Sequence, residues 1–151
     1  MRNLSIIIMT IDELQNEVVE EFSDFTDWMD KYQLLIDLGS DMEPLEEKYK
    51  TEDNLINGCQ SRVWIHADYQ DGLLTFQAES DALIVKGLIA LLLRVLSGHT
   101  PQEILDADLF FIDSIGLRDH LSPTRSNGLL AMVKQIRAYA LAYHTKENAE
   151  A

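Results

Sequence analysis

The chain contains a single cysteine, Cys59, among its 151 residues. One cysteine allows no intrachain disulfide bond, and it allows no zinc or iron–sulfur site that takes several thiolates from the same chain. Any covalent chemistry of this thiol must therefore be completed on a second molecule.

Basic residues are also scarce, since 12 lysines and arginines stand against 26 aspartates and glutamates, a net charge of −14. Most of the imbalance precedes Cys59, because residues 1–58 hold 15 acidic and 4 basic side chains, a net charge of −11. Such a surface repels phosphate backbones and anionic lipid headgroups. The composition therefore disfavours binding to nucleic acid or to a membrane surface.

No apolar run reaches the roughly 20 residues that a membrane span requires. The longest candidate, Ala82–Leu96, contains Lys86 and Arg94, and we predict a buried helix there. Residues 1–9 carry one arginine and a short apolar patch without a cleavage motif, which predicts an N-terminal extension and not a signal peptide. We expect a cytoplasmic protein.

The first half of the chain predicts two helices and a long loop. Thr10 and Glu13 have the spacing of a capping box, so a helix should run from there to about Phe25. A second helix over about 27–38 is expected to end at Gly39, because glycine commonly follows a helix C-terminus. Residues 40–58 lack sustained periodicity and are predicted to be irregular.

A β-hairpin is predicted after Ser61, where apolar and polar residues alternate. Asp71-Gly72 is a hairpin turn signal, and residues 73–79 read as the returning strand. Because a two-stranded hairpin is only marginally stable by itself, we expect another short strand and helices packed on the sheet.

The second half of the chain is predicted to be helical. Ser80 or Asp81 should cap the apolar helix that ends before Gly98, and Thr100-Pro101-Gln102-Glu103 opens another helix. A helical connector over 108–121, a long helix from Pro123 to about Tyr143 and a frayed tail over 146–151 should follow. The sequence therefore predicts one α+β domain over residues 10–145.

Cys59 is the first candidate for chemistry. A lone cysteine is usually an inert core residue. Here Gly58 precedes it and the polar residues Gln60 and Ser61 follow it, at the junction of a loop and a strand. Glycine allows close approach by another molecule. The pattern favours a thiol presented to a partner by Gly58, Gln60 and Ser61.

Arg125 and Asp81 are the next candidates. Arg125 is predicted in the first turn of the last helix, where the helix dipole disfavours a cation. It is also predicted on the buried side of that helix, at the azimuth of Leu129, Met132, Ile136 and Tyr143. Either a salt bridge or stabilisation of a thiolate explains it. Asp81 is explained by helix capping alone.

The four histidines suggest no metal site. His66, His99, His120 and His144 lie in unrelated predicted elements, and no HExxH pair is present. The sequence also contains no glycine-rich phosphate loop and no GxSxG elbow. We expect no resident metal or cofactor.

Several sequence blocks resemble the SufE family of sulfur-acceptor proteins, in family order and spacing over about residues 10–144. Thr124 stands where the family usually has serine. The matching blocks are Gly58-Cys59-Gln60-Ser61-Arg62-Val63-Trp64, Glu79-Ser80-Asp81-Ala82-Leu83-Ile84-Val85-Lys86-Gly87-Leu88, Thr100-Pro101, Ile115-Gly116-Leu117 and His120-Leu121-Ser122-Pro123-Thr124-Arg125-Ser126-Asn127-Gly128-Leu129.

The resemblance implies sulfur transfer for iron–sulfur cluster assembly. Cys59 would take persulfide sulfur from a pyridoxal-phosphate (PLP) cysteine desulfurase of the SufS or CsdA type, stimulating it, and pass the sulfur to a SufBCD-type scaffold. The family's invariant aspartate and arginine correspond to Asp81 and Arg125. The implied fold is SufE/NifU-like, a small antiparallel meander sheet packed against helices. Such a carrier activates the desulfurase and is not a stand-alone enzyme.

Two other functions remain open from the residues. A thiol-dependent hydrolase would pair Cys59 with His66 or His120 and would require an oxyanion hole. A non-catalytic interaction module would not require the thiol. For the carrier, we expect a monomer whose Cys59 rests in a partly apolar pocket and swings out when the desulfurase docks.

Overall fold

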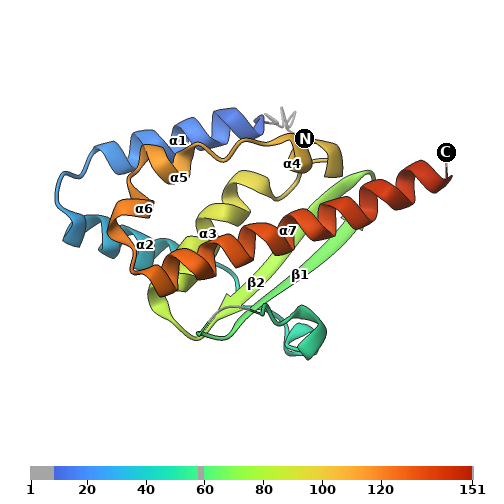
Figure 1. The fold of residues 1–151 in the computed structure, drawn as a ribbon, viewed down its shortest axis with the longest axis horizontal. Helices are drawn as coiled ribbons and strands as arrows, with labels where there is room; N and C mark the ends of the chain where they lie inside the picture. Colours follow the sequence, from blue (N-terminus) through green and yellow to red (C-terminus); the bar gives the residue numbers. More distant parts are fainter. Residues whose placement is uncertain (1–8, 58–59, 151) are drawn as a thin grey trace, which may run out of the picture.

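The computed structural model describes residues 9–57 and 60–150 and has an α+β fold, as predicted (Figure 1). The elements in chain order are α1 (Ile11–Ser23), α2 (Trp28–Asp41), the short 3-10 helices η1 (Glu47–Tyr49) and η2 (Glu52–Asn54), β1 (Val63–Gln70), β2 (Leu73–Ser80), α3 (Leu83–Leu96), α4 (Pro101–Asp106), α5 (Phe111–Ser114), α6 (Leu117–His120) and α7 (Pro123–Glu150).

The hairpin forms as its alternating sequence predicts. β1 and β2 pair antiparallel from Val63 opposite Ser80 to Gln70 opposite Leu73. Asp71 and Gly72 both have positive φ, of 54° and 81°, as a two-residue primed turn requires. One face is buried and consists of apolar side chains from both strands: Val63, Ile65, Ala67, Leu74, Phe76 and Ala78.

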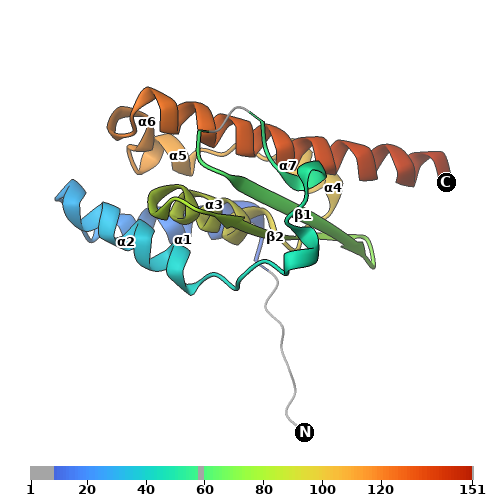
Figure 2. The same ribbon diagram turned by 90° about the horizontal axis from the view of Figure 1, so that it is seen from below.

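The expected additional strand does not form within the described residues. Instead, Leu55 and Trp64 form one isolated bridge, and Leu74 and His99 form another. Each flanking segment runs beside the hairpin for a single residue pair only. The marginal hairpin is instead stabilised by helices, because α3 packs against β2 and α7 crosses β1 (Figure 2).

The starts of α1 and α4 follow the predicted capping. Thr10 with Glu13 and Thr100 with Glu103 each form a complete capping box, and α3 is the buried central helix. His99 is also buried, and its two ring nitrogens lie 3.3 Å from the Leu96 carbonyl oxygen and 2.9 Å from that of Met9. This contact joins the end of α3 to the start of α1.

The prediction that Gly39 ends the second helix is wrong, because α2 continues to Asp41. Gly39 is buried inside the helix, where a Cβ atom would lie 2.8 Å from the backbone nitrogen of Gly87 in α3. The glycine is therefore required for the close crossing of α2 and α3, which a sequence pattern of helix ends does not reveal.

The last helix also extends further than the predicted end at about Tyr143, since α7 reaches Glu150. Its final turns contact the hairpin. Tyr143 stacks on Tyr69 with ring centroids 4.9 Å apart, and the Tyr69 hydroxyl donates to Glu147. These contacts explain why residues 146–150, predicted to fray, are helical.

Within residues 9–57 and 60–150, no helix combines the length and apolar character that a membrane span needs.

Candidate functional site: a pocket between the cysteine segment and the start of α7

A pocket of about 480 Å³ lies where the start of α7, the start of α3 and the segment before β1 meet. Its polar lining consists of Gln60, Ser61, Ser122, Thr124 and Arg125, and its apolar lining of Ala82, Val85, Gly128 and Met132. Two predicted supporting residues, Gln60 and Ser61, thus share a pocket with the predicted arginine.

Cys59 and Gly58 lie outside the described residues, so the structure does not test their predicted placement. The chain on both sides of them is held in place. Upstream, the Ile56 amide donates to the Val63 carbonyl at 2.9 Å. Downstream, Gln60 and Ser61 reach the pocket. The described chain therefore lies against the start of β1 before Gly58 and at the pocket after Cys59.

Asp81 does not cap α3, contrary to the prediction for Ser80 or Asp81. The N-cap position is Ala82, which makes no side-chain cap, while the Ser80 hydroxyl accepts only from the Ala82 amide at 3.2 Å. The Asp81 carboxylate instead accepts the Arg62 amide at 3.0 Å, and the Asp81 amide donates to the Arg62 carbonyl at 3.3 Å. Asp81 thereby holds the chain three residues after Cys59.

Arg125 occupies the first turn of α7, as predicted, and its side chain is exposed at the pocket. Its backbone amide donates to the Ser122 hydroxyl at 3.3 Å, so Ser122 acts as the cap of the helix. The predicted buried stripe below it is confirmed for Leu129, Met132 and Ile136. Among the described residues no ion pair to Arg125 is found, so no carboxylate there neutralises it.

No histidine is among the described residues that line this pocket. The His66 ring bonds to the Asp68 carboxylate at 2.9 Å and stacks on Tyr49. The His120 ring stacks on Trp28, with centroids 4.0 Å apart, and contacts the Gly116 carbonyl. Neither arrangement supports the hydrolase in which one of these histidines would activate Cys59.

Sequence reasoning missed most of the pocket wall. Ser122 was predicted only as the residue before a helix, and Thr124 only as a departure from the family sequence, but both line the pocket. Ala82, Val85, Gly128 and Met132 carry no chemical signal in the sequence. Their role as a wall follows from the approach of α3 to α7, which only the folded chain defines.

The described parts of the chain contain no group of three or more histidine, cysteine, aspartate or glutamate side chains arranged to hold a metal ion. The pocket lining also lacks any acidic side chain within those parts. Among the described lining residues, Arg125 carries the one charged group, and its guanidinium suits an anionic species such as a thiolate or a persulfide.

Comparison with known proteins identifies relatives over most of the chain. The family description "SufE: Fe-S metabolism associated domain" matches residues 16–140, which include Cys59, Asp81 and Arg125. An uncharacterized SufE-like protein of Rhizobium meliloti (strain 1021) is 40% identical over 130 residues, covering 83% of this chain and 93% of the relative. One from Synechocystis is 38% identical over 141 residues, covering 93% and 89%.

A solved structure shares the fold. It is the solution structure of a hypothetical protein from Thermus thermophilus, with a TM-score of 0.72 and 23% identity over 87% of this chain and 96% of that one. The family match includes the segment before β1, the start of α3 and the start of α7, which supply the described lining of the pocket. The chain therefore belongs to the SufE family, whose domain is associated with Fe–S metabolism.

Proposed function

We propose that the protein is a sulfur carrier for iron–sulfur cluster assembly, in which Cys59 accepts sulfane sulfur from a PLP-dependent cysteine desulfurase. One observation carries the proposal: Gln60 and Ser61, which directly follow Cys59, line the same pocket as Arg125. A cation beside a thiol favours its thiolate and persulfide anions, the species that sulfur transfer requires.

In the proposed transfer, the Cys59 thiolate attacks the outer sulfur of the persulfide on the desulfurase. A new S–S bond forms at Cys59, the donor's S–S bond breaks, and the donor cysteine leaves as a thiolate. No oxidant or reductant is consumed, because one sulfane sulfur moves between two thiols. A chain with one cysteine has no second thiol of its own to resolve the product, so the sulfur stays until another protein accepts it.

Each site residue has a distinct role in this proposal. Arg125 stabilises the anionic sulfur, and Asp81 holds the chain after Cys59 through the Arg62 amide. The apolar wall of Ala82, Val85 and Met132 would shield a persulfide from solvent. In this proposal the protein is a monomer in the cytoplasm and activates its desulfurase by accepting the sulfur.

The downstream acceptor in this proposal is a SufBCD-type scaffold. Removal of sulfur by that complex would return Cys59 to the thiolate and allow another cycle. The desulfurase would be of the SufS or CsdA type, and its turnover should rise when the carrier clears its persulfide.

The deciding experiment is intact-mass analysis after incubation with the organism's cysteine desulfurases and free cysteine, with Cys59→Ser as control. We expect a gain of one or more sulfur atoms that reductant reverses and that the control lacks. Absence of any gain with every active desulfurase would overturn the carrier role. If Cys59→Ser also preserved the protein's effect on the desulfurase, the chain would be an interaction module.

A further inference from the structure

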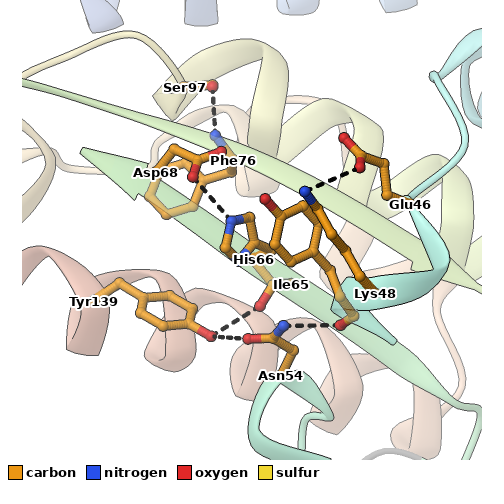
Figure 3. A network of polar contacts seen from close by, with 10 residues as sticks. Glu46, Lys48, Asn54, Ile65, His66, Asp68, Phe76, Ser97 and Tyr139 are labelled. Carbon is orange, nitrogen blue, oxygen red and sulfur yellow. Dashed lines mark hydrogen bonds and ion pairs between the residues drawn. The ribbon is translucent and has the colours of Figure 1, made fainter. Parts of the chain in front are cut away.

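The segment that leads into the cysteine loop, residues 46–57, has little regular structure of its own. It consists of η1, η2 and connecting residues, with one isolated bridge to β1. Such a segment must be held in place by side chains, and Figure 3 shows a polar network over it. Its position matters because it sets where the chain enters the loop that carries Cys59.

Asn54 and Tyr139 join the segment to β1 and α7 in this network (Figure 3). The Asn54 amide nitrogen donates to the Tyr49 carbonyl at 2.8 Å, which closes the two 3-10 turns onto each other. The Tyr139 hydroxyl lies 3.2 Å from the Asn54 side-chain oxygen and 2.8 Å from the Ile65 carbonyl of β1. One hydroxyl thus joins the segment, the strand and α7.

A stacking contact between two rings also holds this segment against β1. The Tyr49 ring lies against His66 of β1, with centroids 3.5 Å apart and planes within 13°. The Ile56 amide then bonds to the Val63 carbonyl, one residue before the chain turns into the loop. The segment is therefore fixed to β1 by a ring contact and to α7 by the Tyr139 hydroxyl.

The environment of Tyr139 suits a permanent donor. The residue is half-buried, and burial raises the pKa of its hydroxyl further above neutral pH, so the hydroxyl is protonated there as in any ordinary tyrosine. Its ring also contacts Phe76 of β2, with centroids 6.4 Å apart, which restricts its movement. The donor is thus held in one position relative to the hairpin.

Tyr139 and Arg125 are part of the same helix, α7, which is continuous from Pro123 to Glu150. They are fourteen positions apart, which corresponds to about 21 Å along a helix. One rigid element therefore carries both the pocket cation and the hydroxyl that holds the segment before Cys59.

We propose that Tyr139, acting through Asn54, is a positioning residue for sulfur transfer: it fixes the entry of the cysteine loop relative to Arg125. The inference rests on the proposed carrier function. It assigns Tyr139 no contact with substrate. Its role is to keep the Cys59 thiol and the Arg125 guanidinium at a fixed relative position, because small errors in the placement of reacting groups lower reaction rates strongly.

The test compares Tyr139→Phe, Asn54→Leu and the double variant in single-turnover persulfide transfer from the desulfurase. Tyr139→Phe keeps the ring and removes only the hydroxyl. We expect the transfer rate constant to fall about three- to tenfold with unchanged affinity for the desulfurase. Both substitutions cut the Tyr139–Asn54 contact, and each also removes a bond of its own, to Ile65 or to Tyr49. The loss of rate in the double variant should therefore be smaller than the sum of the two single losses.

Tyr143→Phe is the matched control, since it removes a hydroxyl one turn further along α7, where the ring stacks on Tyr69 near the hairpin turn. It should transfer sulfur at the wild-type rate. Amide exchange gives a readout independent of sulfur: Tyr139→Phe should accelerate exchange at Ile56, and Tyr143→Phe should not.

The outcomes separate the two proposals. Wild-type protein that accepts no sulfur would overturn the carrier function, whatever the variants do. Wild-type protein that accepts sulfur, with Tyr139→Phe equally fast and Ile56 exchange unchanged, would overturn the positioning role alone. A variant that lost desulfurase affinity and transfer rate together with global stability would also overturn it, because the residue would then be merely structural.

Discussion

At the scale of single residues, Asp81 illustrates how one side chain can connect two elements. Its carboxylate accepts the Arg62 amide across the gap between α3 and β1, while its own amide returns a bond to Arg62. Removing the carboxylate leaves an unpaired amide at the surface, where water replaces the partner. Loss of the carboxylate should therefore mainly make the chain around Arg62 less ordered and should lower the free energy of unfolding only slightly.

We predict that Asp81→Ala lowers the free energy of unfolding by about 1 kcal/mol or less and accelerates amide exchange at Arg62. Iodoacetamide should modify Cys59 faster in this variant, because the chain after the thiol is less restrained. Mass spectrometry measures both the exchange and the alkylation. Asp68→Ala removes a carboxylate from β1 outside the loop and should leave both unchanged. Equal alkylation rates in wild type and Asp81→Ala would contradict this role.

Arg125 is predicted to act through its charge. Arg125→Ala should slow persulfide acceptance by Cys59 about tenfold, and Arg125→Lys should retain part of the rate because a cation remains at the pocket. Single-turnover transfer monitored by intact mass measures this. Arg118→Ala, which removes an exposed arginine paired with Asp113, is the control. If Arg125→Lys transferred sulfur no faster than Arg125→Ala, the site would require the guanidinium geometry and not only a positive charge. If Arg125→Ala transferred sulfur at the wild-type rate, Arg125 would have no role in persulfide acceptance.

At the scale of elements, the crossing of α2 and α3 depends on two glycines in direct contact. A Cβ atom at Gly87 would lie 2.2 Å from the Leu35 carbonyl oxygen, far inside contact distance. Neither backbone can yield without separating the two helices, because both are part of the core.

Gly87→Ala should therefore lower the free energy of unfolding by at least about 2 kcal/mol, through overpacking against backbone. Gly98→Ala provides the comparison: Gly98 has φ of 84° but open space around it, so only backbone strain of about 1 kcal/mol is expected. Urea unfolding of both variants tests the difference. Equal losses, or a milder effect at Gly87, would show that α2 and α3 can move apart.

At the scale of the whole molecule, the stability of the fold at acid pH depends on the hydrogen bonds of three carboxylates. Hydrogen bonds from the Thr10 and Thr100 backbones lower the pKa values of Glu13 and Glu103, and a hydrogen bond from Arg94 lowers the pKa of Glu21. A lowered pKa in the folded state gives stability that is present above the unfolded value of about 4.3 and is lost as pH falls through the folded value.

We predict that the unfolding free energy of the wild type falls more steeply below about pH 4.5 than that of the triple variant Glu13→Gln, Glu21→Gln, Glu103→Gln. Glutamine keeps a hydrogen-bond acceptor at each site but does not titrate. Comparing the two proteins removes most of the general effect of charge repulsion, because the wild type carries −14 and the triple variant still carries −11. Urea unfolding at several pH values measures the slopes, and parallel slopes would contradict the prediction.

Local patterns predicted most of the elements. The two capping boxes, the Asp71-Gly72 turn and the alternation through β1 depend on residues a few positions apart, so their physics is contained in short segments. The errors occur where distant segments meet: Gly39 packs against α3, Asp81 bonds to Arg62 just before β1, and the end of α7 contacts Tyr69. A window of neighbouring residues does not contain these partners.

The same distinction applies to function. The sequence by itself determined that thiol chemistry here needs a second molecule, because one cysteine is present. Its local patterns singled out Cys59 and Arg125, and the family resemblance added a role for Asp81. Only the tertiary structure decided that Arg125 shares a pocket with Gln60 and Ser61, and that Tyr139 holds the segment before the loop. The physical reason is that a pocket and a positioning contact arise from the packing of α3, α7 and β1, elements brought together by burial of their apolar faces.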